Sequence, residues 1–271
     1  MFYMLFQQHD VQQGLVRLQY YDHGQWKNFD PAAQDITNRM RRGLIGHWRM
    51  DEQTGNEIAD DSGHEHHATA SGPSPALAKF SRGRLFSFSS KVAPMINVPN
   101  TPLLNFGASF TVSGWIKILN VKYPRTTFAV RKGFGCYFGP LRSGWNPGWE
   151  IGHGYSNTGT DVCIRDHLNN LARGVIVHDD YDQPPFLVNK WAHYVFVFDR
   201  KVKKVFLYLN GRLQKNSLDI SRVTGSITNS KNLEFGTLYG WKTDGYLDEY
   251  RLFNFPLNAV EVAKLYQDHL I

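Results

Sequence analysis

The chain of 271 residues lacks most features that would place it in a membrane, in a disulfide-rich scaffold or on a secretion pathway. No apolar run reaches the roughly 18 residues that a membrane-spanning helix requires, so a membrane-spanning helix is excluded. Cys136 and Cys163 are the only cysteines, which excludes a disulfide framework and leaves open whether the two pair or stay free. The opening MFYMLFQQHD has no basic region and no small-residue cleavage site, so no signal peptide is predicted.

Long runs of one charge are also missing, although the net charge is +6 and the sequence pI is near 9.2. Basic residues occur in short groups, such as Lys201, Lys203 and Lys204, with acidic residues between the groups. This pattern favours an ordinary charged, solvated surface over a nucleic-acid-binding tail. An anionic partner such as an acidic glycan remains the alternative explanation of the basic balance.

Residues 1–42 differ in pattern from the rest of the chain. A strand pair is predicted around Asp22-His23-Gly24, followed by a short helix in PAAQDITNRMRRG, with Pro31 at its start and Gly43 just past its end. So short a segment cannot bury a core of its own. We therefore expect an N-terminal extension, residues 1–42, that docks on the main domain or on a partner and anchors the chain.

From residue 43 to 271 the sequence predicts one all-β domain, because short strands alternate with turn signals. The clearest predicted strands lie at 109–118, 190–199 and 245–254, and 203–216 is predicted to form a hairpin. Asn210-Gly211 favours a type I′ turn in that hairpin. Helical spacing occurs only at the end, in LNAVEVAKLYQDHL, where Asn258 is a suitable N-cap.

Four segments in this order resemble the laminin G-like, concanavalin A-like jelly-roll domains. They are GLIGHWRMDEQTGNEIADDSGHEHHATASG, GRLFSFSSKVAPMINVPNTPLLNFGASFTVSGWIK, KWAHYVFVFD with VFLYLNGRL, and GYLDEYRLFNFPLNAVEVAKLY. Together they cover about residues 43–269, with gaps around 120–190. The resemblance implies a two-sheet antiparallel sandwich with six or seven strands in each sheet and a short C-terminal helix. It also implies a ligand-binding surface made by loops or by the concave face.

The segment DDSGHEHHATASG, residues 60–72, concentrates histidines and acids and raises the question of a metal. A zinc-protease helix needs two histidines four positions apart, whereas His64, His66 and His67 follow a turn signal, so a polar surface loop is favoured. The resemblance implies one structural calcium ion with Asp60 and Asp248 as ligands. The alternative is a calcium-free loop in which Asp60 caps the turn.

A catalytic carboxylate pair is not predicted. The related hydrolases carry a Glu-x-Asp-x-x-Glu string, which this sequence lacks. Asp248 and Glu249 are adjacent, so on a regular strand they face opposite sides and cannot act across one bond. The non-enzyme interpretation is therefore favoured, with a polysaccharide-degrading enzyme as a remote alternative.

The segment 133–190 departs most from the family and is dense in aromatic residues. Sugars stack on such rings and bind nearby polar groups, so a saccharide site is expected there. Its predicted ligand-binding residues are Arg142, Trp145, Asn146, Trp149, His153, Tyr155 and Tyr181. For Trp149 and Tyr155 the alternative is packing in the core.

These expectations combine into a non-catalytic carbohydrate-binding or adhesion module. A purely structural protein–protein interaction module without glycan binding is the alternative. Laminin G-like domains usually work outside the cell, and this chain has its own Met1 and no export signal. Display on a virus or phage particle would explain how a domain without an export signal works outside the cell. Residues 1–42 would then anchor the chain, and the jelly roll would decorate the particle surface.

Overall fold

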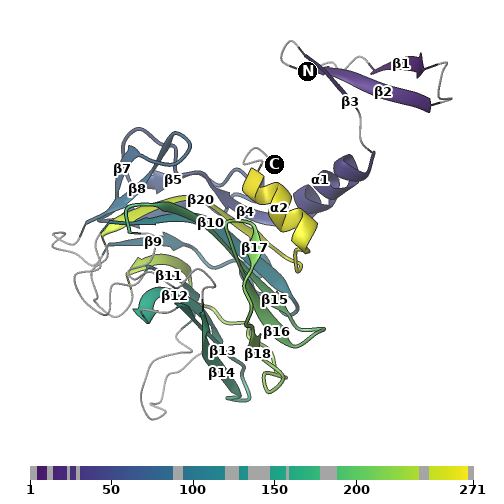
Figure 1. Ribbon diagram of the computed structural model, residues 1–271. Helices are drawn as coiled ribbons and strands as arrows, with labels where there is room; N and C mark the ends of the chain where they lie inside the picture. Colours follow the sequence, from purple (N-terminus) through teal and green to yellow (C-terminus); the bar gives the residue numbers. More distant parts are fainter. Residues whose placement is uncertain are drawn as a thin grey trace. The chain divides into compact units, whose positions relative to one another are not determined.

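The computed structural model describes residues 5–10, 15–22, 25–28, 31–87, 94–119, 128–133, 147–156, 159–177, 188–237 and 244–267. The chain divides into two compact units, Met1–Gly43 and Leu44–Leu270 (Figure 1).

The first unit contains a three-stranded antiparallel sheet, in the order β1-β2-β3, followed by a helix. The elements are β1 (Leu5–Asp10), β2 (Leu15–Asp22), β3 (Gln25–Asn28) and α1 (Pro31–Gly43). The hairpin between β2 and β3 and the helix that begins at Pro31 confirm the sequence predictions. The apolar start was not predicted to be a strand, yet Leu5–Asp10 pairs with β2 along its whole length.

The second unit is a sandwich of two antiparallel sheets (Figure 1). Within the described residues one sheet has nine strands, in the order β17-β16-β15-β10-β20-β8-β7, with β18 on β16 and β4 on β20. Its strands are β4 (Leu44–Trp48), β7 (Ser74–Leu77), β8 (Arg82–Phe86), β10 (Phe110–Ile118), β15 (Trp191–Asp199), β16 (Lys204–Leu209), β17 (Arg212–Leu213), β18 (Leu218–Asp219) and β20 (Gly245–Phe253).

The other sheet has eight strands in the described part of the chain, in the order β14-β13-β12-β11-β19-β9-β6-β5. They are β5 (Glu57–Ile58), β6 (Ala68–Ser71), β9 (Met95–Val98), β11 (Phe128–Lys132), β12 (Gly148–Ser156), β13 (Gly159–Arg165), β14 (Leu171–Val177) and β19 (Leu233–Thr237). A 3₁₀ turn η1 (Pro102–Leu104) and helix α2 (Ala259–Gln267) complete the unit. The predicted jelly-roll class is confirmed. The predicted six or seven strands per sheet were too few, because two-residue strands such as β5 and β17 extend the edges.

The core lies between the two sheets and is rich in aromatic rings. Phe110 stacks on Phe106 at 4.4 Å and on Phe198 at 4.2 Å between ring centroids, and Trp149 lies 5.2 Å from Phe110. Each of these side chains is at most 6% exposed. Burying one such side chain stabilises a fold by about 1.5–3 kcal/mol, so this group alone is a substantial part of the driving force.

Two local predictions about the nine-stranded sheet are confirmed. Strand β15 is buried along nearly its whole length, as its continuous apolar run indicated. Asn210 and Gly211 both have positive φ, 49° and 78°, which is the backbone of the predicted type I′ turn.

Helix α2 covers part of the outer face of the nine-stranded sheet (Figure 1, yellow). Asn258 Oδ1 accepts hydrogen bonds from the amides of Val260 and Glu261, and Glu261 Oε2 accepts one from the Asn258 amide. This reciprocal capping box confirms the predicted N-cap. Tyr266 stacks on Trp115, which projects from β10 away from the core, with ring centroids 5.7 Å apart.

Candidate functional site

The predicted ligand-binding residues fall into three groups. Arg142, Trp145, Asn146 and Tyr181 lie outside the described residues. His153 and Tyr155 lie on strand β12 of the eight-stranded sheet.

Trp149, also on β12, is 1% exposed and belongs to the core. Its prediction as a sugar-stacking residue is wrong, because its indole packs against Phe106, Phe110 and Phe198 between the sheets.

The outer face of the eight-stranded sheet carries a polar ladder at one level of its strands. Val130, Ile151 and Phe235 point into the core, so their neighbours in sequence project from the opposite face. Register pairs place the following residues side by side across six strands, and we call them the polar ladder: Asn97, Glu234, Arg131, Glu150, Cys163 and Arg173. Charges of both signs alternate along it, which suits a ligand rich in hydroxyl groups.

Arg131 is the best-defined member of the polar ladder. Its Nε donates to Glu234 Oε2 at 2.5 Å, and the two side chains are 8% and 22% exposed. A charge-assisted hydrogen bond of this kind holds both side chains in a fixed orientation. The centre of the ladder is therefore organised before any ligand arrives.

Asp161 lies on the same face as the polar ladder, on the next level of β13. Its Oδ2 is buried and has no hydrogen-bond partner within the described residues. Burial raises the pKa of this carboxyl, and the nearby Arg173 guanidinium partly offsets that rise. Because this oxygen is closed to solvent, Asp161 offers no acceptor that a ligand could reach as the described residues stand.

Cys163, a member of the polar ladder, is disulfide-bonded. The sequence had left this open, and Cys136, the one other cysteine of the chain, lies outside the described residues.

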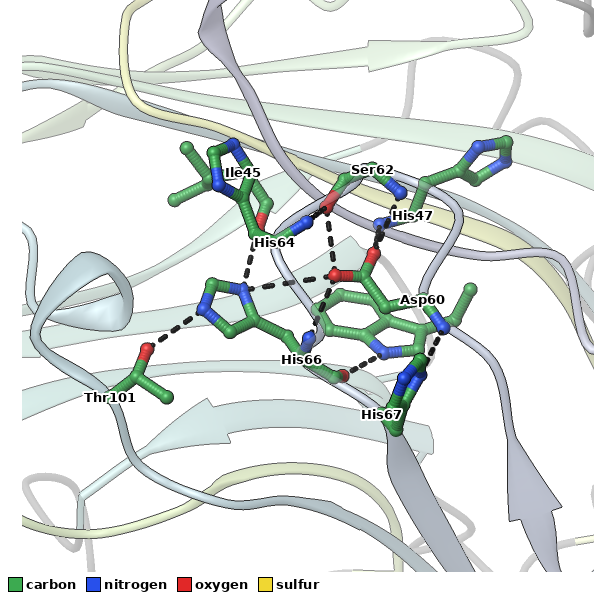
Figure 2. Close-up of polar contacts among 9 residues, drawn as sticks. Ile45, His47, Asp60, Ser62, His64, His66, His67 and Thr101 are labelled. Atoms are coloured by element: carbon green, nitrogen blue, oxygen red, sulfur yellow. Dashed lines mark hydrogen bonds and ion pairs between the residues drawn. The ribbon is translucent and has the colours of Figure 1, made fainter.

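The histidine-rich loop is held together by a network of hydrogen bonds (Figure 2). His66 is 4% exposed; its Nδ1 lies 2.7 Å from the Ile45 carbonyl and its Nε2 lies 2.9 Å from Thr101 Oγ1. His67 Nδ1 accepts a hydrogen bond from the Asp60 amide. Both rings are thus used to fix the loop, as the polar-loop interpretation expected.

Asp60 is the hub of that loop (Figure 2). Its carboxylate accepts hydrogen bonds from the amides of His47, Ser62 and His66 and from the Ser62 hydroxyl, at 2.8–3.0 Å. Burial alone would raise the pKa of Asp60, but these donors outweigh it and lower the pKa below its usual value. The carboxylate therefore caps the turn at Ser62.

The predicted calcium ligands do not fit a common ion as they stand. Asp248 Oδ2 accepts hydrogen bonds from the amides of Lys79 and Phe80, a segment different from the Asp60 loop. The donors around Asp60 present hydrogens, whereas calcium needs a shell of oxygens. Among the described residues no group of three or more His, Cys, Asp or Glu side chains could hold a metal ion. Calcium binding stays a prediction that requires rearrangement of the loop.

Asp248 and Glu249 share one face of the sheet, which corrects the expectation that they face opposite sides. The register between β10 and β20 shifts here: Ser113 pairs with Arg251 but Trp115 pairs with Asp248. Glu249 has φ 53°, a left-handed backbone conformation that is uncommon outside glycine. This β-bulge puts two acidic residues between the core residues Leu247 and Tyr250, and both project outward.

The bulge supports a buried ionic cluster that the sequence reasoning missed. Glu249 Oε2 lies 2.7 Å from both His47 Nε2 and Arg251 Nη2, and all three side chains are at most 5% exposed. Burial raises the pKa of Glu249, but His47 and Arg251 more than offset this and lower it; burial also lowers the pKa of His47. The sequence signal that could have indicated the bulge is the spacing of the apolar residues Leu247 and Tyr250. They are three positions apart, whereas residues on one face of a regular strand are two apart.

The same cluster does not offer two free carboxylates to a substrate. Glu249 is held by His47 and Arg251, and Asp248, 1% exposed, is held by two backbone amides. Burial and the charge of Glu249 raise the pKa of Asp248 to about 8. Such an arrangement is suited to holding the sheet and the 79–80 segment together.

The two-sheet sandwich and the order of its sequence segments are those of a known superfamily. A family model described as the concanavalin A-like lectin/glucanases superfamily, Laminin_G_3, matches residues 91–263. The chain belongs to this superfamily.

Solved structures with the same fold are binding domains of clostridial toxins. The binding domain of Paraclostridial Mosquitocidal Protein 1 matches with a TM-score of 0.63 and 17% identity, over 84% of this chain and 52% of that chain. The binding domain of botulinum neurotoxin DC, in complex with rat synaptotagmin II, matches with a TM-score of 0.65 and 17% identity, over 85% and 52%. A third structure comes from botulinum neurotoxin type C, whose cell entry is described as dependent on interaction with two ganglioside molecules. It matches with a TM-score of 0.66 and 16% identity, over 87% of this chain and 53% of that chain.

The chain spans about half the length of these neighbours, and at such low identity the likeness shows the fold alone. No curated protein matches the chain. Among the described helices, none combines the length and apolar character that crossing a membrane would take.

Proposed function

We propose that the chain is a non-catalytic carbohydrate-binding or adhesion module, displayed on a larger assembly such as a virus or phage particle. The observation that carries the binding proposal is the outer face of the eight-stranded sheet. There the polar ladder crosses six strands, and its members Glu150, Cys163 and Arg173 lie on β12, β13 and β14, which belong to the aromatic-rich segment 133–190. The aromatic residues of that segment are expected to supply the rings on which a sugar stacks, next to these charged groups.

The neighbours support the choice of a binding role. For one of them, cell entry of the toxin is described as dependent on ganglioside molecules. Another is described as the receptor-binding domain of botulinum neurotoxin D. Superfolds host many functions, so this support is an analogy at the level of fold.

A glycan array tests the proposal directly, using the full chain with calcium and with excess chelator. We expect binding to a defined set of glycans, lost in Trp145→Ala and Arg131→Ala and kept in Trp26→Ala, an aromatic control in the N-terminal unit. Absence of binding to any glycan would overturn the carbohydrate proposal. A chelator-sensitive signal would favour the calcium prediction, and an insensitive one would count against it.

A protein–protein interaction module is the second candidate. The neighbour in complex with rat synaptotagmin II favours it, because the same fold occurs there in a domain bound to a protein. Size-exclusion chromatography with light scattering, with and without a glycan that scores on the array, separates the two candidates. A stable protein complex without glycan binding would select the second.

A further inference from the structure

The outer face of the nine-stranded sheet carries a second group of partly exposed side chains, next to the bulge at Asp248 and Glu249. Register pairs align them at one level across β8, β20, β10 and β15, and we call them the aromatic platform: Leu85, Tyr246, Lys117 and Trp191. Their neighbours Ile116, Ala192 and Leu247 point into the core, so the platform faces away from it. All four platform side chains are intermediate in exposure.

Two aromatic rings form the floor of the platform. The centroids of Trp191 and Tyr246 are 5.9 Å apart, with an angle of 49° between the ring planes. Tryptophan and tyrosine left partly exposed on central strands are typical of interaction surfaces, because each offers an apolar face and a polar edge. The apolar C–H face of a sugar ring suits such a floor.

The charge around the platform is positive. Lys117 Nζ lies 5.9 Å from the centroid of the Tyr246 ring, and Lys79 Nζ lies 4.7 Å from that of Trp115, one level further along β10. Neither ammonium forms an ion pair with any described residue. The rings hold both lysines in place without neutralising them.

Two of the acidic residues nearest to these lysines in the sheet are already held by other groups. Asp248 is 1% exposed, and its Oδ2 accepts hydrogen bonds from the amides of Lys79 and Phe80. Glu249 is already paired with His47 and Arg251. Asp244, just before β20, is the one other acid close along the strand.

We propose that the aromatic platform binds an acidic saccharide, with a sugar ring on Trp191 and Tyr246 and a sulfate or carboxylate on Lys117. The proposal rests on the proposed carbohydrate-binding function and adds to it the class of glycan and a second site. That site is distinct from the polar ladder and lies on the other sheet of the sandwich.

Titration calorimetry of the full chain with a heparin-derived hexasaccharide, and with the same hexasaccharide after desulfation and N-acetylation, tests the proposal. We expect Lys117→Ala and Trp191→Ala each to weaken binding of the sulfated probe by about tenfold, the loss typical of one charge-assisted contact. Trp191→Phe should retain most of the affinity. Lys203→Ala is the matched control, because Lys203 is an exposed lysine in the turn after β15.

The outcomes separate this proposal from the proposed function. Equal losses in Lys117→Ala and Lys203→Ala would show unspecific attraction to a basic protein and overturn the platform. Glycan binding that is lost in Trp145→Ala and unchanged in Lys117→Ala would overturn the platform and leave the proposed function standing. If Trp191→Ala melts far below the wild type, Lys117→Ala, a change at a partly exposed side chain, decides the question alone.

Discussion

At the scale of single residues, Asp248 gives the domain an unusual dependence on pH. Its pKa in the folded chain is about 8, raised by burial, whereas an unfolded aspartate titrates near 4. Between these values the folded protein keeps a proton that the unfolded chain has released, so stability falls as the pH rises, by up to about 1.4 kcal/mol per pH unit.

Asp248→Asn should remove that loss, because an amide oxygen can still accept from Lys79 and Phe80 without carrying charge. The variant is expected to melt at a higher temperature than the wild type at pH 8, with the difference shrinking towards pH 5. His193, whose pKa burial lowers to about 3, has the opposite sign and loses stability as the pH falls below 6.5. A difference in melting temperature between Asp248→Asn and the wild type that stays constant from pH 5 to 8 would show that Asp248 is not the source of the pH dependence.

Asp60 provides a second prediction, about the loop that first suggested a metal. Asp60→Ala leaves three backbone amides and a hydroxyl without their acceptor, at a cost of about 1–3 kcal/mol for each buried group that stays unpaired. We expect a clear fall in the free energy of unfolding, measured by urea denaturation. Asp61→Ala is the control: its ion pair with Arg49 is about 40% exposed on both sides and should contribute less than about 1 kcal/mol. Similar effects of the two changes would refute the role of Asp60 as hub.

At the scale of elements, helix α2 tests how far local capping holds the end of the fold. Asn258→Ala removes the acceptor for the amides of Val260 and Glu261 and should destabilise the domain by about 0.5–2 kcal/mol. Asn254→Ala, at an exposed position just after β20, should have little effect. Because Tyr266 stacks on Trp115, quenching of the tryptophan fluorescence reports whether the helix has loosened. Unchanged stability in Asn258→Ala would show that packing alone holds α2.

The elements also show why sequence reasoning succeeded at some places and failed at others. The Asn210-Gly211 turn and the Asn258 cap depend on neighbours a few positions away, so their pattern is legible in the chain itself. The prediction for Trp149 as a sugar-stacking residue failed because nothing in the local sequence shows which face of its strand meets the other sheet. The prediction that Asp248 and Glu249 face opposite sides failed for a different reason. A β-bulge interrupts the alternation there, and only the spacing of the core residues Leu247 and Tyr250 indicates it.

At the scale of the whole molecule, the disulfide at Cys163 predicts how the chain responds to reduction. With two cysteines in the chain and Cys163 bonded, thiol titration of the denatured, unreduced protein should find no free thiol. Reduction should lower the melting temperature, because the loop closed by a disulfide restricts the unfolded chain. Measured free thiols, or a melting temperature that does not move on reduction, would contradict the bond.

The division into two compact units leads to the last prediction, which concerns assembly. The unit that ends at Gly43 holds a three-stranded sheet and one helix, a size at which a chain rarely buries a core of its own, whereas the unit that begins at Leu44 encloses the aromatic core. A chain without residues 1–42 should therefore fold, bind glycans like the full chain and keep its melting temperature within a few degrees. If the N-terminal unit is the anchor to a particle, the truncated chain should be missing from purified particles when co-expressed with the other particle proteins. A full-length chain with alanine in place of Arg39 and Arg41, exposed on α1, separates a basic anchoring surface from the unit as a whole. Truncated chains that still enter particles would refute the anchoring role without affecting the glycan proposals.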